Sequence, residues 1–137
     1  MSEENKKPIG EMPRVSINYE MFEGWIVTAI EGGSNYWCEI PQESFNKELL
    51  ESYKDENLPF SILLATFIWK ERQTIAVCDA MSNEEIGKIN MKSVKKALEM
   101  ICENHAEVFD NLLAEQYDAD DADVFFQYAT LGELTFG

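Results

Sequence analysis

Two adjacent glycines, Gly32 and Gly33, separate a helical pattern from an alternating pattern in the first part of the chain. Apolar residues recur at helical spacing over about residues 20–31, whereas apolar and polar residues alternate over residues 35–40. Because glycine adopts the left-handed backbone at little cost, the pair predicts a cap that ends a helix and leads into a strand. Gly24, inside the helical pattern, predicts close packing against a neighbouring element.

The residues after the glycines, Asn35, Tyr36 and Trp37, combine a side-chain amide with two aromatic rings. The segment is not a phosphate loop, because it lacks the lysine and hydroxyl of a Walker A motif and its glycines follow a helix. A helix C-terminus also carries a negative partial charge, which opposes phosphate. The three side chains are suited to stacking on a planar ligand and to hydrogen bonding with it. The alternative is that both aromatic residues belong to the core.

The rest of the chain predicts a single α+β domain over residues 14–137, with a small antiparallel sheet and four to five helices, after a mobile leader of residues 1–13. The β-rich runs at residues 61–69 and 74–78 are expected to pair as a hairpin. Further strands are expected at residues 15–19 and 134–136, and helices at residues 44–55, at 91–104 after an N-cap at Asn90, at 106–115, and from an N-cap at Asp118 to Gly132.

The charge of the chain is strongly negative and unevenly distributed. Eleven Lys and Arg against 26 Asp and Glu leave a net charge of -15, and no basic residue follows Lys96. Such a surface repels phosphate backbones and anionic membranes, so we expect no direct nucleic-acid or membrane binding by this half. It can attract a basic protein surface, including one that normally holds DNA, although solubility alone also explains it. The one basic cluster is Lys88, Lys92, Lys95 and Lys96.

The acidic run of residues 118–123 invites a calcium interpretation, which fails. An EF-hand loop that starts at Asp118 needs glycine at its sixth position and glutamate at its twelfth, where this chain has Asp123 and Ala129. Helical geometry places Asp120, Asp123 and Gln127 on one stripe. The stripe predicts a polar site for a ligand hydroxyl or base edge. Capping with a solvated face, and a magnesium site, remain alternatives.

Cysteine and histidine usage indicates neither a disulfide framework nor a metal centre. The cysteines are Cys38, Cys78 and Cys102, and only Cys102 has a histidine, His105, at a spacing that can share a metal. A structural zinc site needs four ligands, so each cysteine is expected to be a small buried hydrophobe. We expect no metal and no cofactor. Since no nucleophile, base and electrophile can be named together, a non-enzymatic protein is favoured, and an enzyme stays open.

Two segments resemble motifs of small proteins carried by bacteriophages, prophages and plasmids. They are residues 28–38, which contain Gly-Gly-Ser-Asn-Tyr-Trp, and residues 118–133, and the resemblance spans about residues 19–137. The middle is looser, because residues 71–73 stand where glycines are expected in a hairpin turn. The resemblance implies a bacterial cytoplasm under phage control, where small acidic proteins block or buffer host defence. It implies no particular biochemical activity.

Two hypotheses follow. The first is a non-enzymatic anti-defence protein that binds a nucleotide-like ligand in a cleft between two groups of residues: Asn35, Tyr36 and Trp37 on one side, and Asp120, Asp123 and Gln127 on the other. The second is an acidic inhibitor that mimics nucleic acid on a basic host protein. A cytoplasmic location is expected, since the N-terminus lacks an apolar stretch and runs such as residues 63–69 are far shorter than the ~20 residues that cross a bilayer. The sequence leaves a homo-oligomer open.

Overall fold

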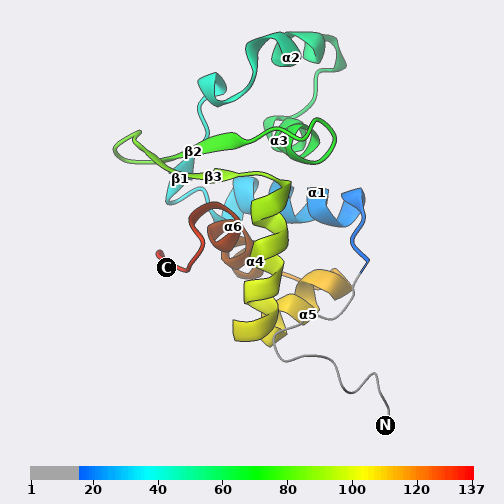
Figure 1. The fold of residues 1–137 in the computed structure, drawn as a ribbon, viewed down its shortest axis with the longest axis vertical. Coiled ribbons are helices and arrows are strands. Elements are labelled where there is room, and N and C mark those ends of the chain that lie inside the picture. Colours follow the sequence, from blue (N-terminus) through cyan, green and yellow to red (C-terminus); the bar gives the residue numbers. More distant parts are fainter. Residues whose placement is uncertain (1–15) are drawn as a thin grey trace.

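The computed structural model describes residues 16–137, which form a three-stranded antiparallel sheet and six α-helices. In the view of Figure 1, α2 and α3 lie above the strands, and α1, α4, α5 and α6 lie below them. The predicted single α+β domain is confirmed, with six α-helices rather than four or five in the described part. The leader expected at residues 1–13 lies outside the described residues. The elements are α1 (Tyr19–Thr28), β1 (Cys38–Glu39), α2 (Lys47–Ser52), α3 (Phe60–Trp69), β2 (Ile75–Asp79), β3 (Glu85–Ile89), α4 (Met91–Asn104), α5 (Ala106–Ala114) and α6 (Ala119–Leu131).

The predicted hairpin between residues 61–69 and 74–78 is wrong, because residues 61–69 belong to α3. This run is apolar at every position except Ser61 and Thr66, so its periodicity does not distinguish a buried strand from a buried helix. The helix follows Pro59 and buries a continuous stretch from Leu64 to Ile68. The hydroxyl of Thr66 donates to the carbonyl oxygen of Ile62 at 2.8 Å, which is the backbone contact that lets a threonine sit inside a helix.

The hairpin of the sheet instead joins β2 to β3, with Ile75 opposite Ile89 and a bulge at Val77 and Cys78. No glycine stands in its turn. The Oδ1 of Asp79 accepts hydrogen bonds from two successive backbone N–H groups, at 2.7 and 3.1 Å, and this side-chain turn replaces a glycine turn. Residues 82–84 belong to the loop of this hairpin, and Glu85 begins β3.

The Gly32–Gly33 pair ends α1 by a route that differs from the predicted left-handed cap. The helix continues into a π-helical turn, Ala29–Gly33, and the only glycines of residues 16–137 with positive φ are Gly132 and Gly137. A Cβ on Gly33 would collide with the backbone oxygen of Ala119, so this glycine allows the start of α6 to pack against the turn. Residues 35–37 form a turn, and the strand expected at residues 35–40 shrinks to β1.

The ends of α4 and α6 follow the predicted capping signals. Asn90 forms a capping box with Ser93 at the start of α4, and Asp118 forms one with Asp121 at the start of α6. Gly132 closes α6 in the left-handed conformation, with φ of 82°. The terminal strand expected at residues 134–136 does not form; those residues fold back beside α6 (Figure 1).

Aromatic side chains at the junction of α1, α3 and α6 form the centre of the core. The side chains of Phe22, Trp25, Phe67 and Phe125 are fully buried. The indole N–H of Trp25 donates to the backbone oxygen of Leu112 at 3.2 Å, so its polar group stays paired inside the core. The close packing predicted at Gly24 is confirmed, since a Cβ there would collide with the hydroxyl of Tyr117. This core holds α6 against the turn that follows α1.

Candidate functional site

A buried carboxylate, that of Asp123 in the second turn of α6, joins the two segments that the sequence singles out. Its side chain is 8% exposed and accepts four hydrogen bonds. Oδ1 accepts from the hydroxyl of Ser34 and the indole N–H of Trp37, each at 2.7 Å. Oδ2 accepts from the hydroxyl of Tyr36 at 2.8 Å and from Nε2 of Gln127 at 3.0 Å. These five residues are called the Asp123 network below.

Local structure explains why these groups meet. The π-helical turn and Gly33 bring the backbone of residues 34–37 against the first turns of α6. On α6, Asp123 and Gln127 are four residues apart and therefore lie on one face. A buried carboxylate costs free energy unless donors surround it, and both oxygens of Asp123 are paired. The four hydrogen bonds thus compensate the cost of burying the Asp123 carboxylate.

The second half of the network ties down the end of the chain. Gln127 is 1% exposed, and its Oε1 accepts from the backbone N–H groups of Thr135 and Phe136 at 2.8 and 2.9 Å. Its Nε2 also donates to the backbone oxygen of Phe136 at 3.2 Å. The ring of Phe136 stacks on Trp37, with centroids 5.0 Å apart and planes at 11°. Residues 133–137, called the C-terminal tail below, therefore cover the network.

No protein-family model, curated protein or solved structure matches this chain. Function is accordingly inferred from the geometry and charge of the chain itself.

Four of the six predicted ligand-binding residues come together, namely Tyr36, Trp37, Asp123 and Gln127. The other two, Asn35 and Asp120, are exposed, and neither side chain makes a hydrogen bond among the described residues. The four that meet contact one another directly, where the sequence predicts a cleft between them. Their polar atoms are paired within the protein, so a ligand would have to displace existing contacts.

Sequence reasoning misses Ser34, which belongs to the Asp123 network, and the two tail residues that cover it. Ser34 lies between the predicted glycine cap and the predicted strand, and its type alone does not indicate a buried donor. The tail residues Thr135 and Phe136 alternate in polarity, which favours the strand that the sequence predicts for them. A signal for Ser34 does exist: a small hydroxyl residue beside a glycine pair can approach a helix closely enough to donate to it.

The network changes the acid–base behaviour of two neighbouring groups. Burial of the hydroxyl, its hydrogen bond to Asp123 and the charges of Asp123 and Asp120 raise the pKa of Tyr36 to about 12. Burial, and next the charge of Asp123, raise the pKa of the Cys38 thiol to about 12. Cys38 therefore stays a thiol at neutral pH, which argues against a nucleophilic role.

The described residues contain neither a cluster of metal ligands nor a membrane-spanning helix. Among residues 16–137, no three His, Cys, Asp or Glu side chains gather in a group that could hold a metal ion. His105, which lies at a spacing from Cys102 that can share a metal, has its Nε2 2.9 Å from the hydroxyl of Tyr128. No helix in the same range has the length and apolar character that a bilayer crossing requires.

Cavities on the described part of the chain lie away from the Asp123 network. One of about 440 Å³ lies between α2 and α3, where Phe45, Tyr53 and Phe60 contribute to its wall. A neighbouring one of about 410 Å³ shares Phe45 with it. A third, of about 290 Å³, lies between α4 and the end of α6. No member of the network lines any of these three cavities, although its Tyr36 is 51% exposed.

The C-terminal half exposes carboxylates with no cationic partner. The two ion pairs among residues 16–137, Lys54 with Glu51 at 2.6 Å and Lys88 with Glu85 at 3.7 Å, both lie before this half. The exposed carboxylates after Lys96 are called the C-terminal acidic set. They are Glu99, Glu103, Glu107, Asp110, Glu115, Asp118, Asp120 and Glu133.

Proposed function

We propose that this chain is a non-enzymatic binding protein that docks on a basic protein surface through the C-terminal acidic set. The observation that carries the proposal is the lack of any ion pair to this set among the described residues. Unpaired like charges weaken folding by mutual repulsion. A complementary cationic surface would turn the same charges into a source of fast and selective association. Asp118 stabilises the start of α6 as its cap, whereas no ion pair holds the other members of the set among the described residues.

The expected partner is a protein surface that normally holds nucleic acid. Two features support this. The carboxylates occur at intervals of three or four residues along α4 and α5, as with Glu99 and Glu103 or Glu107 and Asp110, so they lie along helix faces. The resemblance to phage, prophage and plasmid proteins supports a partner of this kind in a bacterial cytoplasm, in an anti-defence role. Blocking a nucleic-acid site needs charge and shape, and it needs no catalytic group.

The test compares two variants with equal loss of charge. The first neutralises Glu99, Glu103, Glu107 and Asp110. The second neutralises four exposed carboxylates outside the C-terminal half: Glu39, Glu43, Glu48 and Glu84. Asp118 and Asp121 are left intact because they cap α6. Each protein is used to capture partners from a bacterial lysate.

We expect one partner to be captured by the wild type and the second variant, to be lost with the first variant, and to be released by added duplex DNA. Equal capture by both variants would contradict the proposal. Equal loss with both variants would also contradict it, because net charge alone would then explain the binding.

A second candidate function is binding of a nucleotide-like ligand at the Asp123 network. The observation that favours it is the position of the tail. Phe136 stacks on Trp37, and the backbone of Thr135 and Phe136 bonds the amide of Gln127. A base with a polar edge could make the same two kinds of contact after displacing the tail.

This candidate predicts that a chain without residues 134–137 gains thermal stability from a nucleotide panel, and that the intact chain gains less. If neither protein shifts with any member of the panel, the candidate fails.

A further inference from the structure

The cavity between β3, α4 and the end of α6 combines features that no part of the proposed function uses. Its volume is about 290 Å³, near the lower limit for small-molecule sites. Lys88 of β3 and Lys96 of α4 both line it, with Ser93 between them in sequence. Two cations from different elements thus border one cavity in a chain whose net charge is -15.

A buried hydroxyl at the same cavity lacks a partner. Thr130 lines the cavity and is 7% exposed, and its Oγ1 is the one buried side-chain nitrogen or oxygen of the described residues without a hydrogen bond. Thr66 shows the usual solution in a helix, since it donates to the carbonyl four residues earlier. An unpaired buried hydroxyl costs about 1–3 kcal/mol. The accessible surface of this Oγ1 is below 1 Å², so a ligand oxygen would remove that cost only once the Thr130 side chain rotates toward the cavity.

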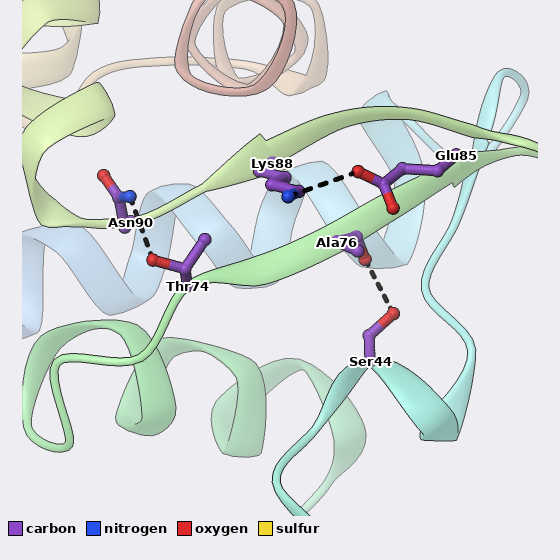
Figure 2. A network of polar contacts seen from close by, with 6 residues as sticks. All are labelled: Ser44, Thr74, Ala76, Glu85, Lys88 and Asn90. Atoms are coloured by element: carbon purple, nitrogen blue, oxygen red, sulfur yellow. Dashed lines mark hydrogen bonds and ion pairs between the residues drawn. The ribbon is translucent and has the colours of Figure 1, made fainter.

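The backbone of β3 is shaped around this threonine. A Cβ at Gly87 would lie 2.8 Å from the Cγ2 of Thr130 and would collide with its backbone oxygen. Gly87 therefore permits β3 to pass directly over Thr130, next to Lys88. Figure 2 shows Lys88 on β3 with its ammonium directed toward Glu85. That pair is 3.7 Å apart with both side chains more than half exposed, so it leaves Lys88 available to another anion.

The long-range field of the molecule does not prevent an anion from binding here. At physiological ionic strength, charges beyond about 8 Å are largely screened. Within that range, Lys88 and Lys96 line the cavity, and they must outweigh both Glu85, which is 3.7 Å from Lys88, and the negative C-terminal end of α6. Neutralisation of the α6 helix end by lysines is the alternative explanation, since Leu131 and Gly132 also line the cavity. It accounts for the lysines and leaves Thr130 unexplained.

We propose that this cavity binds the phosphate group of a small phosphorylated molecule. A phosphate monoester offers three strong acceptor oxygens, and the cavity offers two ammonium groups and the hydroxyl of Thr130. The hydroxyl of Ser93 already donates to the backbone oxygen of Asn90 at 3.0 Å. The site shares no residue with the C-terminal acidic set, so it stands or falls separately from the proposed function.

The probes are inorganic phosphate, AMP and adenosine, and the readouts are backbone amide shifts by NMR and the midpoint of thermal unfolding. We expect phosphate and AMP to perturb the amides of residues 87–96 and 128–132 and to raise the midpoint. Adenosine, which lacks the phosphate, should do neither. Absence of any response to phosphate and AMP would overturn the proposal, as would an equal response to adenosine.

Matched variants separate a defined site from general attraction. Lys88→Gln with Lys96→Gln should weaken AMP binding by about tenfold or more. Lys92→Gln with Lys95→Gln removes the same charge from residues that do not line the cavity, and it should weaken binding less than threefold. Equal weakening by both pairs would overturn the site.

Thr130→Val tests the hydroxyl. It replaces an unpaired polar atom with a methyl group, so the free protein should be as stable as the wild type or more stable. AMP binding should nevertheless fall severalfold. Binding that this variant leaves unchanged would contradict the site as proposed.

Discussion

The indole N–H of Trp37 donates to Oδ1 of Asp123 at 2.7 Å, and this bond joins the turn after α1 to the second turn of α6. The two residues are far apart in sequence, and both are buried. The same carboxylate holds Ser34 and Tyr36, so one charge fixes the whole turn. The segments that look most like a ligand site in sequence are thus used to close the fold.

Asp123→Asn should be strongly destabilising. The amide that replaces the carboxylate presents an NH2 group to two of the four donors, so at least one buried donor loses its partner. Loss of charged hydrogen bonds in a buried site predicts a decrease of about 2–4 kcal/mol in the free energy of unfolding. Urea unfolding measures it. Asp120→Asn is the matched control, because it removes the same charge from an exposed position of α6 and should change stability by less than about 0.5 kcal/mol.

Tyr36 should lose its proton only at unusually high pH, because its pKa is raised from 10.0 to about 12. The folded state holds this proton more tightly than the unfolded state does. The stability that results is therefore complete below pH 10 and is lost as the pH rises toward about 12. Tyr36→Phe should be less stable than the wild type at pH 8, and the difference should shrink above pH 10.

Tyrosinate absorbance provides the direct measurement for this residue. The pKa of Tyr53 is also raised to about 12, chiefly by its hydrogen bond to Glu71, and burial raises the pKa of Tyr19, so the wild type should show three tyrosines that titrate above the usual pH. Tyr36→Phe should show one fewer. A Tyr36 that titrates near 10 would contradict the hydrogen bond to Asp123.

The two adjacent glycines should respond differently to alanine. A Cβ at Gly33 collides with the backbone oxygen of Ala119, which cannot move without shifting α6. A Cβ at Gly32 has no heavy atom within 4 Å outside its neighbours. Gly33→Ala should therefore lower the thermal unfolding midpoint by several degrees, whereas Gly32→Ala should leave it unchanged or raise it slightly. Equal effects at both positions would show that α6 does not pack on this turn.

Phe136→Ala should release the C-terminal tail. The substitution removes the ring stacked on Trp37, at a cost of about 1–3 kcal/mol. Trp37 should become more accessible, which collisional quenching of tryptophan fluorescence detects. Leu134→Ala is the control, since Leu134 is 40% exposed and lies in the same tail. Unchanged quenching in Phe136→Ala would mean that the tail does not cover Trp37.

Features with local causes were predictable from the sequence. The caps at Asn90, Asp118 and Gly132 each depend on one side chain or one backbone conformation, and all three are confirmed. The run at residues 61–69 was not predictable as a helix, because only Ser61 and Thr66 interrupt its apolar residues and no polar face is visible. The pairing of β2 with β3 depends on the side chain of Asp79 in a turn without glycine, a weaker signal than the usual turn residues.

The site was predictable only in part. The sequence brings Tyr36 and Trp37 together with Asp123 and Gln127, and the structure confirms that these four residues meet. The sequence alone does not indicate whether these residues enclose a cleft, because that depends on the position of Phe136. The C-terminal tail reaches its position only once the rest of the chain has folded, and no pattern in residues 133–137 indicates that position. The roles of Thr130 and Gly87 have the same origin, since they arise only when β3 crosses α6.

The salt dependence of partner binding tests the central proposal most directly. With the partner captured by the wild type, the logarithm of the dissociation constant is measured against the logarithm of salt concentration for the wild type and both charge variants. We expect a steep slope for the wild type, a much shallower one after neutralisation of Glu99, Glu103, Glu107 and Asp110, and a nearly unchanged one for the control variant. A flat wild-type slope, or a steep slope that survives the first variant, would contradict docking through the C-terminal acidic set.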